Sequence, residues 1–137
     1  MNGPPLGASP QVPVLGLGSL LLVTLQSELY DGAAEQLQHD LTERIASSPV
    51  TGVVIDLSGV EIVDSFLGRV LAEIASSARL LAARTVLAGM RPAVAITMVE
   101  LGLTLPGLAT ALDVERALAL LGHDPATALP VRAGEDA

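Results

Sequence analysis

Cysteine and lysine are both absent from this chain of 137 residues. Without cysteine, the protein has no disulfide, no thiolate nucleophile and no cysteine-based metal site. Without lysine, it lacks the side chain used in Schiff-base chemistry and in phosphate-binding P-loops. The formal net charge is −8, and an acidic chain repels nucleic-acid phosphates and anionic lipid surfaces. These features argue against nucleic acid and membrane as partners, and they exclude several classes of enzyme chemistry.

Aromatic residues are nearly absent as well, since Tyr30 and Phe66 are the only two. The chain therefore offers few platforms on which nucleic-acid bases could stack. Half of the residues are hydrophobic, so the core must consist mainly of leucine, valine, isoleucine and alanine. Such an apolar excess indicates either an exposed apolar surface that drives assembly or simply an alanine- and leucine-rich core. The composition alone leaves both explanations open.

The two ends of the chain differ from its middle. Residues 1–11 are rich in proline, glycine and serine, and residues 124–137 are rich in proline, alanine and glycine. We expect both to be flexible tails around a single domain at residues 12–123. The first residues lack the basic segment and apolar run of a signal peptide, and the apolar stretch 12–25 is too short to span a bilayer. We therefore expect a cytoplasmic protein.

The hydrophobic pattern alternates between strand and helix along the chain. Strands are predicted at two segments within 12–26, broken at Gly16 and Gly18, and at 52–57, 85–87 and 110–112. Helices are predicted from about 31 to 47–49, at 65–81 and 92–101, and at 114–121 with Asp113 as the N-cap. Each predicted helix has an apolar stripe. In the first two helices the stripes are Tyr30, Ala34, Leu37, Leu41 and Ile45, and then Leu67, Val70, Leu71, Ile74, Ala78 and Leu81. In the third helix the stripe is Val94, Ile96, Val99 and Leu101, and in the last it is Leu118 and Leu121. The ββαβαβαβα order predicts an α/β fold, a mixed sheet of about four or five strands packed with four helices, with 52–57 as a central strand.

Motifs for metal, nucleotide or catalytic sites are missing. The two histidines, His39 and His123, lie at no metal-binding spacing, and no glycine-rich phosphate loop or nucleophile elbow is present. We therefore expect no metal, no cofactor and no enzymatic activity. A small enzyme or ligand-binding α/β domain is the alternative class, and it would require a polar pocket with perturbed titratable groups.

One local group of residues has the chemistry of a switch. The predicted strand 52–57 is followed by a turn, by Glu61 and Asp64, and then by Ser65 at the start of an amphipathic helix. In the ordinary interpretation, Asp64 is the N-cap and Ser65 is a first-turn residue. In the functional interpretation, a phosphate on Ser65 adds about −1.5 to −2 charge where the helix dipole tolerates it. The docking surface around Glu61 and Asp64 would then become much more negative, while the fold would survive.

The stretch VVIDLSGVEIVDSFLGRVL, residues 53–71, resembles the signature of the STAS domain of anti-sigma-factor antagonists and stressosome proteins. The stretches VPVLGLGSLLLVTLQSEL (12–29) and LAGMRPAVAITMVELGL (87–103) extend the likeness to the RsbS-type scaffold branch of that family. The resemblance implies that an RsbT-type serine/threonine kinase phosphorylates Ser65. It also implies assembly with RsbR-type STAS proteins in a large complex that holds the kinase until phosphorylation releases it, which controls stress signalling to an alternative sigma factor or a similar output. Thr97 lies where RsbR-type domains carry a second phosphorylated threonine, and it is a secondary candidate.

The expected partner-binding surface consists of the residues around the modified serine: Glu61, Asp64, Ser65, Phe66 and Arg69. A free anti-sigma-factor antagonist, which binds an anti-sigma kinase directly through the same region, is the alternative within the family. The two alternatives differ in assembly size, because the scaffold forms a very large particle and the antagonist binds one partner as a monomer.

Overall fold

The computed structural model of the protein describes residues 12–26, 31–103 and 108–122. These residues form strands and helices in the predicted ββαβαβαβα order. The strands are β1 (Val14–Leu17), β2 (Leu20–Gln26), β3 (Gly52–Gly59), β4 (Arg84–Ala88) and β5 (Ala109–Ala111), and the helices are α1 (Asp31–Ser47), α2 (Ser65–Leu80), α3 (Pro92–Glu100) and α4 (Val114–Leu120). The expected tails, 1–11 and 124–137, lie outside the described residues, as do Tyr30 and His123.

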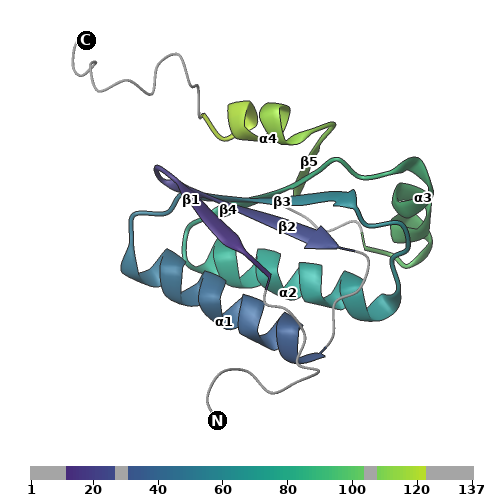
Figure 1. Ribbon diagram of the computed structural model, residues 1–137, viewed down its shortest axis with the longest axis horizontal. Coiled ribbons are helices and arrows are strands. Elements are labelled where there is room, and N and C mark those ends of the chain that lie inside the picture. Colours follow the sequence, from purple (N-terminus) through teal and green to yellow (C-terminus); the bar gives the residue numbers. More distant parts are fainter. Residues whose placement is uncertain (1–11, 27–30, 104–107, 123–137) are drawn as a thin grey trace.

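The strands form one mixed sheet in the order β1-β2-β3-β4-β5 (Figure 1). β1 is antiparallel to β2, and the other neighbours are parallel. β3 lies in the middle, and its residues Val53, Val54 and Ile55 are fully buried. Strands that are buried on both faces read as continuous apolar runs, which explains why 52–57 could be identified as central. The prediction of a mixed sheet around this strand is confirmed.

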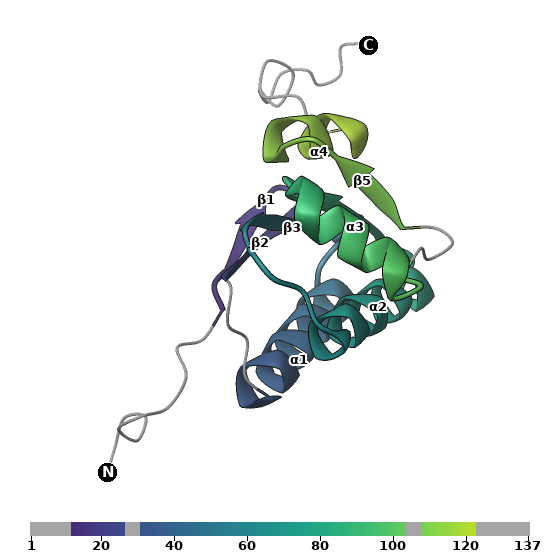
Figure 2. The same ribbon diagram turned by 90° about the vertical axis from the view of Figure 1, so that its right-hand side faces the viewer.

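Helices cover both faces of the sheet. α1 and α2 lie side by side below one face, α4 lies above the other, and α3 packs at one end of the sheet (Figures 1 and 2). The large core between the sheet and the first two helices contains the predicted stripes: Ala34, Leu37, Leu41, Ile45, Leu67, Val70, Leu71, Ile74 and Ala78. A smaller core under α4 centres on the fully buried Ala117, with Leu118 and Leu121 packed against it. The prediction that Leu81 belongs to the apolar stripe of α2 is wrong, because Leu81 is the C-cap residue of this helix and is 38% exposed.

The buried side of α3 differs from the prediction. Val94 is buried as expected, but its partner on the buried side is Met98. Ile96 and Val99 are 60% and 65% exposed, and Leu101 just after the helix is 40% exposed. The sequence PAVAITMVE is apolar almost all round, so no stripe of polar residues marks the solvent side. The buried side of α3, which carries Val94 and Met98 at i, i+4 spacing, is therefore set by its contact with the core and not by the pattern of the sequence.

Strand boundaries also differ in detail. Gly59, expected in a turn, is the last residue of β3 and pairs with Gln26 across a register irregularity in β2. Gly16, expected to interrupt a strand, lies inside β1 and pairs with Leu21, so only the turn at Gly18 separates the first two strands. The last strand is β5, and Leu112 beyond it is 78% exposed. These strand boundaries depend on the pairing between neighbouring strands, and the hydrophobic pattern of a single strand does not contain that information.

Thr85 is a buried polar residue within β4. It is 3% exposed, and its Oγ1 has no hydrogen-bond partner among the described residues. We expect Thr85→Val to raise the free energy of unfolding by about 1 kcal/mol or more, because a buried hydroxyl without a partner costs about 1–3 kcal/mol. A thermal melt should rise by several degrees. Thr110→Val on β5 is the matched control, since Thr110 is exposed and should show little change. A lower melting temperature for Thr85→Val would contradict the assignment.

Candidate functional site

The start of α2 is capped by Asp64, as the sequence predicted. Asp64 has an extended backbone, with φ −119° and ψ 179°, and its side chain accepts a hydrogen bond from the backbone N–H of Leu67 at 2.9 Å. Its carbonyl accepts the first bond of the helix, from the N–H of Gly68 at 3.0 Å. Ser65 is therefore the first helical residue, and it is exposed. The cap is complete without the Ser65 hydroxyl, which leaves that hydroxyl available for chemistry.

The loop from β3 to α2 is fixed by two buried valines. Val60 is fully buried and donates its N–H to the carbonyl of Leu57 at 2.9 Å, and Val63 is 5% exposed. Between them, Glu61 and Ile62 point outward, and Ile62 is 75% exposed. Ile62 is not among the site residues that the sequence predicts. No signal in the sequence marks it, because Val60, Ile62 and Val63 are all apolar and only the fold shows that the two valines are the buried ones.

A second loop, from β4 to α3, supports the first. The Asp56 carboxylate accepts a hydrogen bond from the N–H of Ser58 at 2.9 Å. The Nε of Arg91, in the second loop, donates to the carbonyl of Ser58 at 3.2 Å. Both loops follow the carboxyl ends of adjacent parallel strands, so they lie at the same edge of the sheet. The hydrogen bond from Arg91 connects the second loop to the end of β3, directly before the site loop.

The predicted partner-binding residues lie along this loop and the first turns of α2. Glu61, Asp64, Ser65 and Arg69 are exposed, whereas Phe66 is half-buried and packs against the core. Arg69 lies four residues after Ser65, the spacing at which helical side chains are neighbours. No ion pair to Arg69 is found within the described residues. The surface thus combines two carboxylates, one hydroxyl, one guanidinium and exposed apolar surface.

Thr97, the secondary candidate, lies on α3 rather than on this surface. Its hydroxyl donates a hydrogen bond to the backbone carbonyl of Ala93 at 3.1 Å, and the residue is partly exposed. A bond to the carbonyl four residues earlier is common for a threonine within a helix. The contact gives Thr97 an ordinary structural role.

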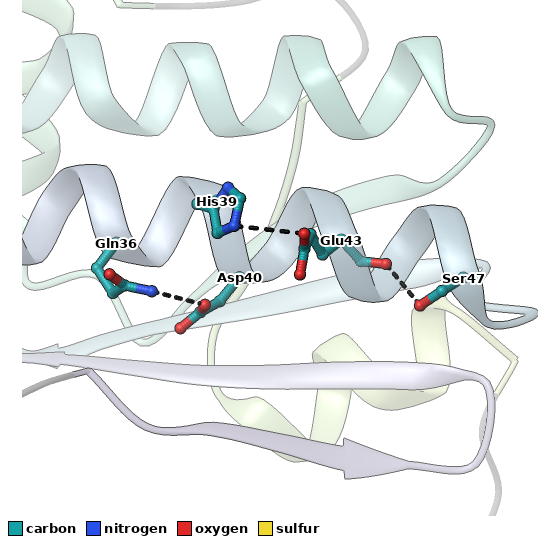
Figure 3. A network of polar contacts seen from close by, with 5 residues as sticks. All are labelled: Gln36, His39, Asp40, Glu43 and Ser47. Atoms are coloured by element: carbon teal, nitrogen blue, oxygen red, sulfur yellow. Dashed lines mark hydrogen bonds and ion pairs between the residues drawn. The ribbon is translucent and has the colours of Figure 1, made fainter.

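The exposed side of α1 contains a network of polar contacts (Figure 3). His39 Nε2 lies 3.4 Å from Glu43 Oε2, and these side chains are 64% and 69% exposed. Gln36 donates to Asp40 at 2.9 Å, and the Ser47 hydroxyl donates to the Glu43 carbonyl at 2.7 Å. The described residues contain no group of three or more histidine, aspartate or glutamate side chains that could hold a metal ion. His39 lies on a solvated helix face, as its position in the sequence predicted.

A pocket of about 700 Å³ lies between α3 and the strands β4 and β5. Its described lining is Leu87, Met90, Ala95, Met98, Val99, Leu103, Leu108, Thr110, Ala111 and Leu112. None of these side chains is ionisable, so this lining supplies no acid or base for catalysis. No helix in the described part of the chain is both long and apolar enough to cross a membrane.

Residues 11–117 match the STAS domain family. The chain belongs to the STAS family. Curated STAS relatives include the RsbT co-antagonist protein RsbRD of Bacillus subtilis (strain 168), which is 30% identical over 116 residues, covering 84% of this chain and 41% of the relative. RsbRA of the same organism is 27% identical over 127 residues, covering 85% and 46%. The chain thus spans less than half the length of these relatives.

Solved STAS structures show the same arrangement. A serine-to-glutamate variant of RsbS from Moorella thermoacetica has a TM-score of 0.74 and 41% identity, with 82% of this chain and 96% of that chain covered. A chain from a structure of the stressosome, described as a signal integration and transduction hub, has a TM-score of 0.72 and 42% identity over 80% and 96%. The anti-sigma-factor antagonist SpoIIAA in its unphosphorylated form, at 20% identity and a TM-score of 0.66, shares the fold. The resemblance to stressosome STAS proteins is therefore confirmed.

Proposed function

We propose that this STAS domain is a non-enzymatic, cytoplasmic stressosome scaffold that holds an RsbT-type serine kinase and releases it when Ser65 is phosphorylated. The main supporting observation is the exposed Ser65 hydroxyl beside an N-cap that Asp64 completes alone. A kinase can reach this hydroxyl, and a phosphate can be added without the loss of a helix cap. The names of the relatives agree with this role, since they include RsbS, the stressosome and RsbT co-antagonists.

The local charges explain how the phosphate would act. At the first helical position, the positive end of the helix dipole stabilises an added negative charge, so the fold is retained. Arg69, one turn along the same helix, is placed to contact the phosphate. Glu61 and Asp64 are exposed on the same surface. A partner that covers the surface would then have to desolvate three adjacent negative groups, and desolvated like charges are costly.

The surface also supports assembly with other STAS domains. Several large apolar side chains are at least half exposed: Leu15, Ile62, Leu80, Ile96, Val99 and Leu112. Val99 and Leu112 line the same pocket, so part of this exposed apolar surface is contiguous, which favours an apolar interaction face over a purely alanine- and leucine-rich core. We therefore propose that the chain associates with itself and with RsbR-type STAS proteins, and that neither metal nor cofactor is needed for this.

Assembly size tests the scaffold role against the free-antagonist alternative. The protein should be sedimented alone, with an RsbR-type protein, and with both an RsbR-type protein and the kinase. We expect a large particle that contains all three proteins, because a scaffold presents several apolar surfaces at once. The RsbR-type protein with the kinase, in the absence of this chain, is the control. A monomer that binds one kinase molecule and no RsbR-type protein would instead support the free antagonist.

A further inference from the structure

Ile62 is a solvent-exposed apolar side chain close in the chain to Ser65, the proposed phosphorylation site. It is 75% exposed and precedes Ser65 by three residues. Isolated exposed apolar residues are common and need no explanation by themselves. Ile62 differs because of its place, since it lies in the loop that leads directly into the Ser65 position.

The backbone holds Ile62 outward. Val60 is fully buried, Val63 is 5% exposed, and Asp64 is fixed by its cap to Leu67. Val60 also donates to the Leu57 carbonyl at the end of the central strand. With both flanking valines buried, Ile62 cannot turn inward unless one of them is displaced from the core. The backbone at Ile62 is therefore constrained on both sides, and its β-branched side chain has few χ1 rotamers, so little conformational entropy is lost when a partner covers it.

The neighbours of Ile62 define what can cover it. Glu61 and Asp64 are both exposed, so the rim around the isoleucine is acidic. Charge complementarity excludes a partner with an acidic rim, and the isoleucine itself fits an apolar socket. A kinase whose active site reaches the Ser65 hydroxyl comes close to this loop, because only Val63 and Asp64 separate Ile62 from Ser65. The same protein would then lie over Ile62.

We propose that Ile62 is the apolar anchor of the kinase-docking surface, inserting into an apolar socket with a rim free of acidic side chains on the kinase. This inference rests on the proposed function and specifies its mechanism. The anchor contributes to the affinity of the resting complex, because full burial of one isoleucine corresponds to about ten- to a hundredfold in affinity. A phosphate on Ser65 would bring a strongly hydrated group to the edge of this apolar contact. Release would then follow from the cost of removing that hydration.

The test compares single substitutions by their affinity for the kinase, measured on unphosphorylated protein. Ile62→Ala should weaken binding by about ten- to a hundredfold, from the apolar area that is lost. Ile62→Leu should bind within a few-fold of wild type. Leu120→Ala is the control, because Leu120 is 46% exposed on α4, which covers the other face of the sheet from α2 (Figure 1), and should bind as wild type. All three variants should melt close to wild type, since exposed side chains contribute little to stability.

The outcomes separate this inference from the proposed function. If wild type binds the kinase and is phosphorylated on Ser65, but Ile62→Ala binds equally well, the anchor is disproved and the proposed function stands. An equal loss of affinity in Leu120→Ala would also disprove the anchor, because the effect would not be local. The loss in Ile62→Ala should persist at high salt, because apolar burial is not screened. Failure of wild type to bind the kinase at all would overturn both proposals.

Discussion

Phosphorylation of Ser65 is expected to release the kinase from the complex while the domain stays folded. Ser65→Ala should take up no phosphate from the kinase and should keep the kinase bound, with an almost unchanged melting temperature, because Asp64 caps α2 without help from the hydroxyl. Ser65→Asp should also fold, since the helix dipole favours a negative charge at that position. Its affinity for the kinase should fall by about tenfold or more, because docking would desolvate a third negative group beside Glu61 and Asp64.

The measurement is kinase retention by the assembled complex, together with a thermal melt of each protein. Ser76→Asp is the matched control, because Ser76 is exposed on the same helix and the variant carries the same added charge away from the loop. It should retain the kinase. Phosphorylated wild type decides the outcome, since aspartate is an imperfect substitute for phosphoserine. Full retention of the kinase by the phosphorylated, folded protein would refute the switch, and mass spectrometry that places the phosphate on Thr97 would refute the choice of residue.

Much of the fold was predictable because many of its determinants are local. α1 and α2 each carry a clear apolar stripe, and β3 is a continuous apolar run. The caps were predictable for the same reason: Asp64 and Asp113 each accept a hydrogen bond from the N–H three residues later, at 2.9 Å and 2.8 Å. Such bonds need only the right residue before a helix. The face of α3 was mispredicted because an almost wholly apolar helix contains no local signal for its buried side.

The candidate site was predictable only in part. The sequence places Asp64 and Ser65 at a helix start, since the strand, the turn and the helix are all local features. The exposure of Ile62 could not be inferred in the same way, because an isoleucine between two valines reads as core. The support from Arg91 also required the fold, because the parallel pairing of β3 and β4 brings the two loops together. The proposed switch residue could thus be identified from the local sequence, whereas the support of its loop depends on tertiary contacts.

Gly89 is the position where that tertiary support can be broken. Its φ is +72°, and a Cβ there would lie 3.1 Å from Ser58 Cβ and 3.2 Å from Asp56 Oδ1. Gly89→Ala should therefore lower the free energy of unfolding for two reasons. The left-handed backbone should cost about 1–2 kcal/mol, and the close contact of the new Cβ with Ser58 and Asp56 should cost about 1 kcal/mol more. The alanine would also push on the segment that leads into the Ser65 loop. Kinase affinity should fall although Gly89 is outside the docking surface.

Gly102 provides a control with the same backbone angle. Its φ is also +72°, but a Cβ there meets no atom of the described residues within 4 Å apart from those of its neighbours in the chain. Gly102→Ala should therefore cost only the backbone term, about 1–2 kcal/mol, and should leave kinase binding unchanged. Urea unfolding and kinase affinity should be measured for both variants under the same conditions. The difference between them isolates the contact of Gly89 with Asp56 and Ser58, and equal stability losses with equal kinase affinities would show that the second loop does not support the docking surface.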